Sequence, residues 1–359
     1  MKVERLNKVL KEMEKKNIPQ IIVCDPPSIF YLTGKWISPG ERLLALYLNL
    51  EGNHKLFLNE LFPVYEDLGI EKVWFNDSQD GVEIISKYVD SSKIIGIDKN
   101  WPSRFLLRLM EFTEGCKFVN GSSVLDTVRM FKDEEEKDLM RDASRTNDMA
   151  IEKLIGLLSK EKYTEKKMAQ MLLDIYEDMG ADGYSFSPIV AYGANGADPH
   201  HEVDGSMVKE GDSIIIDIGC LKNSYCSDMT RTVFYKSVSD KAKEVYNIVL
   251  EANKKAIEAV KPGVRFCDID AAARNHIEKA GYGKYFTHRT GHSIGIEVHD
   301  FGDVSSINTD VVKPGMIFSI EPGIYLTGEF GVRIEDLVLV TEDGCEVLNK
   351  YDKEIKVIG

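Results

Sequence analysis

The sequence predicts an α/β domain over residues 1–125 and a second domain, with both helices and strands, over residues 126–359. A chain of 359 residues has the length of two ordinary domains. Strand and helix patterns alternate over about the first 120 residues, which is typical of an α/β domain. A charged run at 130–137 then opens a long helical pattern, and we place the boundary just before it.

The first domain should open with an amphipathic helix, because apolar residues recur there at helical spacing, at Leu6, Val9, Leu10 and Met13. An apolar run at 20–24 precedes Asp25-Pro26-Pro27 and predicts a strand that enters a turn. Further strands are expected at 43–50, 55–58, 72–75 and 93–97, and helices near 81–89 and 102–113. No glycine-rich phosphate-binding motif occurs, so nucleotide binding has no support.

The second domain should begin with two helices, one from the charged run to about residue 158 and one at 164–179. The charged run also has a simpler explanation, because acidic residues suit the solvated first turn of any helix. Strands are expected at 187–192, 212–220, 225–235, 316–326 and 331–341, and further helices at 240–260 and 268–280.

Composition narrows the class of protein. The chain is 43% hydrophobic, which excludes a disordered protein, and its net charge of −14 without a basic patch disfavours a nucleic-acid partner. Apolar runs are far shorter than the roughly 18 residues of a membrane-spanning helix, and the charged first residues do not suit a secretory signal. The six cysteines form no CxxC pair, so no disulfide framework or zinc ribbon is indicated. We expect a soluble cytoplasmic protein without membrane partners.

Carboxylates interrupt three apolar strand patterns, at Asp217, Glu321 and Glu335, and Asp228 lies in a polar segment of a fourth. An unpaired charge inside such a strand would cost several kcal/mol. Each carboxylate alone could be explained by an edge position, a capped turn or an ion pair with Arg231 or Arg333. Three together are harder to explain in this way, and a shared positive charge would stabilise all of them.

Histidines gather in the same part of the chain: five of the seven lie between residues 200 and 299, at His200, His201, His288, His292 and His299. Two divalent ions about 3.5–4 Å apart need several carboxylates, and an imidazole among oxygen ligands favours Mn, Co, Fe or Zn. A water shared by two such ions loses a proton near neutral pH and can attack a carbonyl that one ion polarises. Nearby histidines could stabilise the oxyanion or bind substrate. The residues therefore indicate a metallohydrolase.

The order of these residues resembles a known family. Asp217, Asp228, Gly291-His292, Glu321-Pro322-Gly323 and Arg333-Ile334-Glu335-Asp336 are similar to the five-ligand dinuclear site of the pita-bread metallopeptidases. That superfamily includes prolidase, aminopeptidase P, methionine aminopeptidase and creatinase. The resemblance implies an α+β catalytic domain over residues 126–359, with a curved antiparallel sheet and covering helices. Residues 1–125, with Tyr31-Leu32-Thr33-Gly34, resemble the creatinase-type α/β leading domain.

The resemblance also implies a role for each site residue. Asp217 would bind one metal ion and Asp228 and Glu335 would bridge both, while His292 and Glu321 complete the second. The expected cofactor is two divalent ions per subunit, manganese first, with cobalt, zinc or iron as alternatives. Glu321 would also accept a proton from the attacking water. Two histidines are expected to act on the substrate, His200 on the tetrahedral intermediate and His299 on the substrate carbonyl. Ser293 and Asp300 depart from the residues common in the family, but neither position is a ligand.

Within the superfamily, the loop at 36–42 and the segment at 193–201 resemble bacterial prolidases, in which the former closes over the active site of a partner subunit. The resemblance thus implies a homodimer. A dipeptidase must bind the free carboxylate of its substrate, and a guanidinium suits this role. Arg289 is the first candidate, with Arg42 and Arg333 behind it; the alternative is an arginine without a functional role.

The resulting hypothesis is metal-dependent hydrolysis of Xaa-Pro dipeptides. Proline has no N–H and a fixed φ, so Xaa-Pro bonds suit a metal-centred pocket better than peptidases that bind an extended backbone. The nearest alternative is aminopeptidase P, which cleaves longer Xaa-Pro peptides. Creatinase-like chemistry needs no metal, but such proteins lose the acidic ligands and here all five ligands remain. A non-enzymatic binding protein on the same fold is the alternative from another class.

Overall fold

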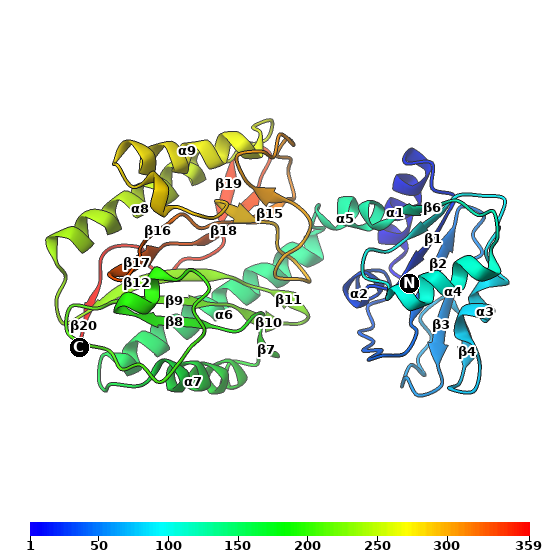
Figure 1. The fold of residues 1–359 in the computed structure, drawn as a ribbon, viewed down its shortest axis with the longest axis horizontal. Coiled ribbons are helices and arrows are strands. Elements are labelled where there is room, and N and C mark those ends of the chain that lie inside the picture. Colours follow the sequence, from blue (N-terminus) through cyan, green and yellow to red (C-terminus); the bar gives the residue numbers. More distant parts are fainter. The chain divides into compact units, whose positions relative to one another are not determined.

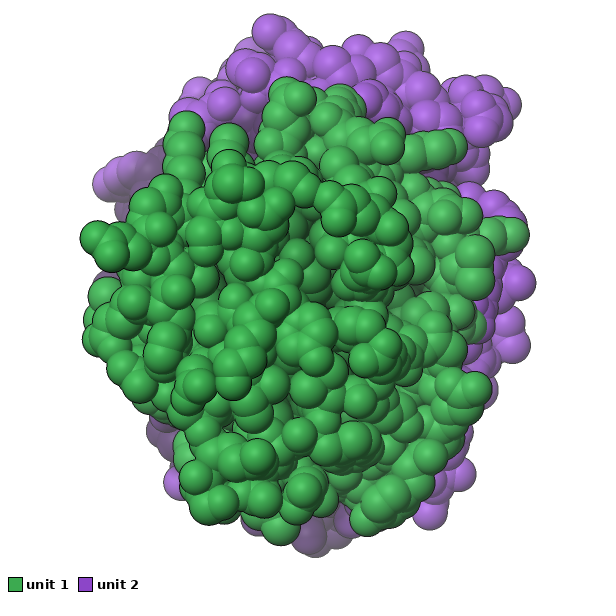
Figure 2. Space-filling model, turned by 90° about the vertical axis from the view of Figure 1, so that its right-hand side faces the viewer, with its two compact units in different colours: residues 1–129 green, residues 130–359 purple.

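The computed structural model describes residues 1–359 and contains two compact units, Met1–Arg129 and Met130–Gly359 (Figures 1 and 2). The division follows the last helix of the first unit, α5 (Ser122–Arg129). It lies just before the charged run at 130–137 and four residues after the end of the predicted leading domain. No helix combines the length and the apolar character needed to cross a membrane.

A mixed six-stranded sheet forms the centre of the N-terminal unit, in the order β4-β3-β2-β1-β5-β6. Its strands are β1 (Gln20–Val23), β2 (Ala45–Asn49), β3 (Lys55–Asn59), β4 (Glu71–Phe75), β5 (Ile95–Ile97) and β6 (Phe118–Asn120). Strand β2 runs antiparallel to β1 and β3, while the other pairs are parallel. The unit therefore has the α/β character that its alternating patterns predict.

Helices accompany this sheet: α1 (Val3–Lys15), α2 (Pro26–Thr33), α3 (Gly81–Ser86), α4 (Ser103–Phe112) and α5. Residues of α3 and α4 share one apolar core with β1, β2 and β3. The expected turn at Asp25-Pro26-Pro27 is instead the start of α2. Asp25 caps this helix by accepting a hydrogen bond from the Ser28 amide, and Pro26 suits the first helical position.

The C-terminal unit consists of two helix pairs on opposite sides of short, mostly antiparallel sheets (Figure 1). One pair, α6 (Glu134–Leu158) and α7 (Glu165–Asp178), shares an apolar core with the sheet β20-β12-β9-β8. The other pair, α8 (Asp240–Ala259) and α9 (Phe266–Lys279), shares a core with strands β15 to β18. Strands from both halves lie between the helix pairs, and the site residues come from these strands and the loops that join them.

The strands of this unit are β7 (Gly183–Tyr184), β8 (Ile189–Tyr192), β9 (Ser213–Ile218), β10 (Cys220–Lys222), β11 (Tyr225–Cys226), β12 (Met229–Tyr235), β13 (Gly291–His292), β14 (Asp303–Val304), β15 (Ile317–Ile320), β16 (Gly323–Leu326), β17 (Phe330–Arg333), β18 (Asp336–Val340), β19 (Cys345–Val347) and β20 (Val357–Ile358). The helix predictions for this unit are confirmed to within about two residues. Three predicted strands are each two strands here, because the chain leaves the ladder at Asp228, at Glu321-Pro322 and at Ile334-Glu335.

Candidate metal centre

A cavity of about 440 Å³ in the C-terminal unit collects nine of the ten residues that the sequence predicts for the site. Such a volume suits a small-molecule ligand. The nine are His200, Asp217, Asp228, Arg289, His292, His299, Glu321, Arg333 and Glu335. His288 also lines the cavity, with apolar contributions from Phe186, Ile189, Pro199 and Val298.

Three carboxylates, Asp217 and Asp228 from one half of the unit and Glu335 from the other, meet around Thr230 of β12. Asp217 of β9 stands opposite Thr230 in the antiparallel register, and Asp228 lies two residues before it. Glu335, between β17 and β18, donates its amide to the Thr230 carbonyl at 3.0 Å and accepts the Thr230 hydroxyl at 2.8 Å. All three carboxylates are buried, and these backbone hydrogen bonds hold them close to one another.

Strands β13 and β15 bring His292 beside Glu321. The Glu321 amide donates to the Thr290 carbonyl at 2.7 Å, and the His292 amide donates to the Ser319 hydroxyl at 3.0 Å. A side chain at Gly291 would place its Cβ 1.8 Å from the Ser319 carbonyl oxygen, so this close approach requires glycine.

The His292 ring is oriented as a metal ligand would be. Its Nδ1 lies 3.2 Å from the Ser293 carbonyl, which can only accept, so in the neutral ring Nδ1 carries the proton. The lone pair of Nε2 then faces Asp228 Oδ2 at 3.5 Å and Glu321 Oε1 at 3.6 Å. A lone pair opposite two carboxylate oxygens is repulsive unless a cation lies among them, and this backbone bond is typical of metal-binding histidines.

Unpartnered atoms indicate the same chemistry. Asp217 Oδ1 and Asp228 Oδ1 are buried and accept no hydrogen bond, which is costly for a carboxylate in the interior. Ligand atoms of Asp228, His292 and Glu335 lie within 4.8 Å of one another. Burial and the nearby carboxylates raise the pKa of Asp228 and of Glu335 well above the usual range. A cation would remove this repulsion, so the residues present fit a divalent metal.

Glu321 differs from the other carboxylates in its surroundings. Burial acts to raise the pKa of Glu321, but the His292 and His288 rings, where protonated, and the Arg333 guanidinium outweigh burial and lower this pKa. The group is therefore ionised at neutral pH and can accept a proton.

The Arg333 guanidinium is hydrogen-bonded to other residues of the protein and is not left free for a ligand. It is buried and donates to Asp217 Oδ2 at 2.7 Å, to the Thr230 hydroxyl at 3.1 Å and to the Tyr325 hydroxyl at 3.0 Å. These bonds orient Asp217 directly and Glu335 through Thr230. The geometry thus favours a positioning role over the substrate-binding role expected from sequence.

An ion pair with an arginine therefore explains the buried carboxylate of Asp217 but not those of Asp228 and Glu335. The other arginine considered from sequence, Arg231, pairs with Asp336 at 2.7 Å, and Asp336 also accepts Lys353 Nζ at 2.6 Å. Arg231 reaches Glu335 only at its backbone carbonyl, at 2.6 Å. Arg231 thus holds the backbone of Glu335, and its charge is paired with Asp336, so the Glu335 carboxylate is left without a cation.

Arg289 is the arginine with free donors. Its guanidinium lines the cavity and makes no hydrogen bond or ion pair with another residue. His200 and His299 also line the cavity with exposed rings. The His299 ring meets the His292 ring edge-on, with centroids 4.3 Å apart. Partial burial, with smaller contributions from the neighbouring His292 and Arg289, lowers the pKa of His299 to about 4, so this ring is neutral at neutral pH.

Sequence reasoning missed Tyr325, which links two parts of the site. The His288 Nδ1 donates to the Arg289 carbonyl at 2.7 Å, so its Nε2 accepts the Tyr325 hydroxyl at 2.7 Å. That hydroxyl in turn accepts a bond from Arg333. The signal was present, because Tyr325 follows Gly323 by two residues and strand alternation places it on the same face.

Arg42 lies in the N-terminal unit. Its guanidinium makes a bidentate pair with Asp77, at 2.9 Å for both bonds. It lines a separate cavity of about 480 Å³ within that unit. Its predicted role in binding substrate stays a prediction.

Residues 138–342 match metallopeptidase family M24, and residues 5–131 match the creatinase/prolidase N-terminal domain. The chain belongs to family M24. The predicted metallopeptidase is thereby confirmed, and so is the two-domain pita-bread fold, with its α/β leading domain and α+β catalytic domain.

This M24 peptidase is similar to proteins over their whole lengths. An uncharacterized peptidase of Staphylococcus saprophyticus is 35% identical, over 97% of this chain and 100% of the relative. A prolidase from Thermococcus sibiricus has a TM-score of 0.92 at 33% identity, over 100% of this chain and 99% of that one. An X-Pro aminopeptidase from Thermotoga maritima has a TM-score of 0.83 at 29% identity, over 97% of this chain and 100% of that one.

Proposed function

We propose that this peptidase hydrolyses Xaa-Pro dipeptides with the help of two divalent cations, held by Asp217, Asp228, His292, Glu321 and Glu335. The observation that carries the proposal is the buried group of carboxylates that faces the His292 Nε2 lone pair, with two unpartnered oxygens and no internal cation for Asp228 or Glu335. Manganese is the first metal to test. We also propose a homodimer, a cytoplasmic location and a leading domain over residues 1–125, as the resemblance implies.

The residues of the chain divide the work of hydrolysis. Two bound cations lower the pKa of water and polarise a carbonyl. Glu321 is ionised and lies beside His292, so it can take the proton that the attacking water loses. His200 and His299 line the cavity with free ring edges, and each can donate to the oxygen on which negative charge develops.

The free guanidinium of Arg289 supports a dipeptide as the substrate. In a dipeptide the residue after the scissile bond carries the free C-terminal carboxylate. A guanidinium without a protein partner in the cavity suits that group. The similarity to the Thermococcus prolidase supports the same substrate. The similarity to the Thermotoga aminopeptidase supports aminopeptidase P activity as the second candidate, because that enzyme has the same fold at nearly the same identity.

A comparison of three peptides tests the choice between the two candidates. We expect the manganese-loaded protein to hydrolyse Ala-Pro faster than Ala-Pro-Ala and faster than Ala-Pro amide, which lacks the carboxylate. Hydrogen bonds to a charged group contribute about 1.5–3 kcal/mol, so kcat/KM for the amide should be lower by roughly 10- to 100-fold. Equal or faster cleavage of Ala-Pro-Ala would favour aminopeptidase P. Absence of turnover on every Xaa-Pro peptide with Mn, Co and Zn would favour the non-enzymatic binding protein.

Replacing His200 by alanine should lower kcat by roughly 10²–10³, the effect of losing one donor to an oxyanion, with little change in KM. Its ring has no partner within the chain, so the substitution should leave the fold intact. Steady-state kinetics and a melting curve measure both properties. An unchanged kcat would remove His200 from the mechanism.

A further inference from the structure

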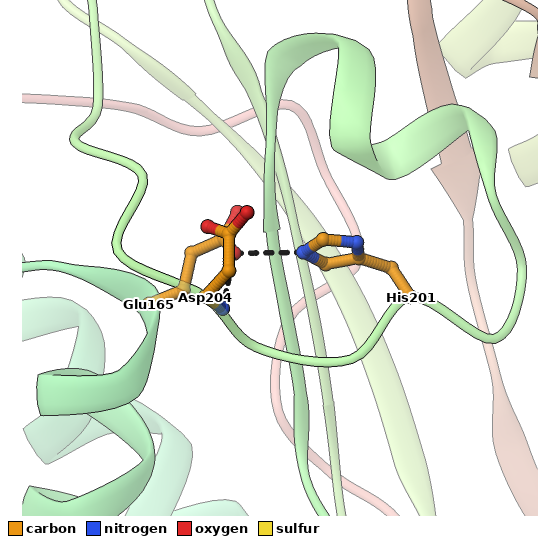
Figure 3. Close-up of side chains that lie close together, drawn as sticks. All are labelled: Glu165, His201 and Asp204. Atoms are coloured by element: carbon orange, nitrogen blue, oxygen red, sulfur yellow. Dashed lines mark hydrogen bonds and ion pairs between the residues drawn. The ribbon is translucent and has the colours of Figure 1, made fainter.

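The loop between β8 and β9 carries His200, and it is wrapped around one buried carboxylate. Glu165, the first residue of α7, is completely buried. Its Oε1 accepts the Tyr192 amide and the Asn195 side chain, both at 2.9 Å. Its Oε2 accepts His201 Nε2 at 2.7 Å and the Asp204 amide at 3.1 Å (Figure 3). Four donors from a stretch of thirteen residues thus converge on one side chain.

This cluster differs from the metal centre although it also brings together three possible ligands, Glu165, His201 and Asp204. Both oxygens of Glu165 have two donors each, and the Asp204 carboxylate accepts the Ser206 amide at 2.7 Å. A carboxylate can only accept, so His201 Nε2 carries a proton toward Glu165. The His292 Nε2 has a lone pair in the equivalent direction. The cluster is therefore a hydrogen-bonded clamp, with no orphan atom for a cation.

The clamp has a partner on the other side of His200. The Pro199 carbonyl accepts Arg333 Nη1 at 3.4 Å, while the His201 side chain is held by Glu165. Gly196, earlier in the loop, packs closely on β17. A Cβ at Gly331 of that strand would lie 1.8 Å from the Gly196 carbonyl oxygen. The His200 ring itself has no internal partner. Its position over the cavity is therefore set by its two neighbours in the chain.

We infer that Glu165 and His201 form a positioning pair that holds His200 against the reacting carbonyl. The inference rests on the proposed function of His200 in peptide hydrolysis. A side chain that donates to an oxyanion must hold its place closely, because a displacement of about 1 Å can cost about 10²-fold in rate. Neither Glu165 nor His201 lines the cavity, so both act through the loop and not on the substrate.

Two substitutions at His201 distinguish the loss of its hydrogen-bond donor from a change in the size of the side chain. In glutamine the amide nitrogen lies the same number of bonds from Cβ as Nε2 does in histidine, whereas methionine has similar length and no N–H. We expect His201→Met to lower kcat by roughly 10- to 100-fold with little change in KM. His201→Gln should recover most of kcat. The ring is partly exposed, with 14% of its side chain accessible, so both variants should fold. Equal kcat in the two variants would overturn the inference.

The decisive test is a double-mutant cycle with His200→Ala. If His201 acts through His200, His201→Met should lower kcat no further once His200 is alanine. The full 10- to 100-fold loss in both backgrounds would mean that the pair acts elsewhere and would overturn the inference. Glu165→Gln should behave as His201→Met does. Glu177→Gln is the matched control, because Glu177 lies exposed on the same helix and should leave kcat unchanged.

Hydrogen exchange reports on the clamp without any peptidase activity. In metal-free His201→Met, we expect faster exchange of the Tyr192 and Asp204 amides, which both donate to Glu165, than in His201→Gln. Unchanged exchange in His201→Met would overturn the clamp itself. If the wild-type protein hydrolyses no peptide while exchange responds as expected, the proposed function fails and the clamp stands, so the two failures are distinguishable.

Discussion

Asparagine at position 228 should abolish metal-dependent turnover while the protein stays folded. Asp228→Asn keeps the shape of the side chain but removes a charge from the group that faces His292 Nε2. Transition-state stabilisation by bound metal amounts to several kcal/mol, so a loss of about 4 kcal/mol, or about 10³-fold in kcat, is the expected scale. In the metal-free protein the amide relieves repulsion with Asp217 and Glu321, so the free energy of unfolding should be unchanged or higher.

Metal content, kcat and melting temperature together check this result. Manganese at 100 times its Kd should stabilise the wild-type protein by about 2.7 kcal/mol and the Asp228→Asn variant by much less. Glu335→Gln should behave in the same way. Asp310→Asn serves as the control, because Asp310 is exposed and does not line the cavity. Substantial residual kcat in Asp228→Asn would refute the ligand assignment.

Methionine at position 333 should destabilise the fold as well as the site. Arg333→Met removes the cation from Asp217 and leaves the Thr230 and Tyr325 hydroxyls without a donor. Breaking a buried ion pair by removing one partner costs about 3–5 kcal/mol, because the remaining charge is uncompensated. We expect a loss of that size in the free energy of unfolding of the metal-free protein, measured by urea denaturation.

Arg289→Met is the matched control for this result. Arg289 has no partner within the chain, so its loss should raise KM for Ala-Pro and leave the free energy of unfolding within about 0.5 kcal/mol of wild type. If Arg333→Met instead raised KM without destabilising the protein, Arg333 would be a substrate-binding residue as the sequence suggested, and its structural role would be refuted.

Helices and strands could be predicted from the sequence wherever residues close in the chain determine them. Helices such as α6 and α8 repeat their apolar residues at one period and begin at a capping side chain, Asp133 in α6 and Ser239 in α8. The breaks inside three predicted strands were not predicted, because apolar residues resume within two residues of each break. At Glu321 the break has a physical reason: Pro322 cannot donate to a ladder, and the strand restarts at Gly323.

Prediction of the site had the same limit, because partners that are distant in the sequence could not be assigned. Asp217 and Glu335 could be singled out because an ionisable group in an apolar run needs compensation. An ion pair with Arg333 was one of the alternatives, but the sequence could not assign Arg333 to Asp217, which is 116 residues away, or place the Thr230 hydroxyl on Glu335, which is 105 residues away. Glu165 gave no signal at all. It is an ordinary acidic residue in the first turn of a helix, and only the folded loop shows four donors around it.

The two halves of the catalytic unit contribute separately to the proposed metal centre. Asp217 and Asp228 belong to the half with α6 and α7, whereas His292, Glu321 and Glu335 come from the half with α8 and α9. Cations shared by both sets would cross-link two layers that otherwise meet through packing, hydrogen bonds and the ion pairs Arg333–Asp217 and Arg231–Asp336. The loaded protein would then melt as one cooperative block, and chelation would free each layer to loosen by itself.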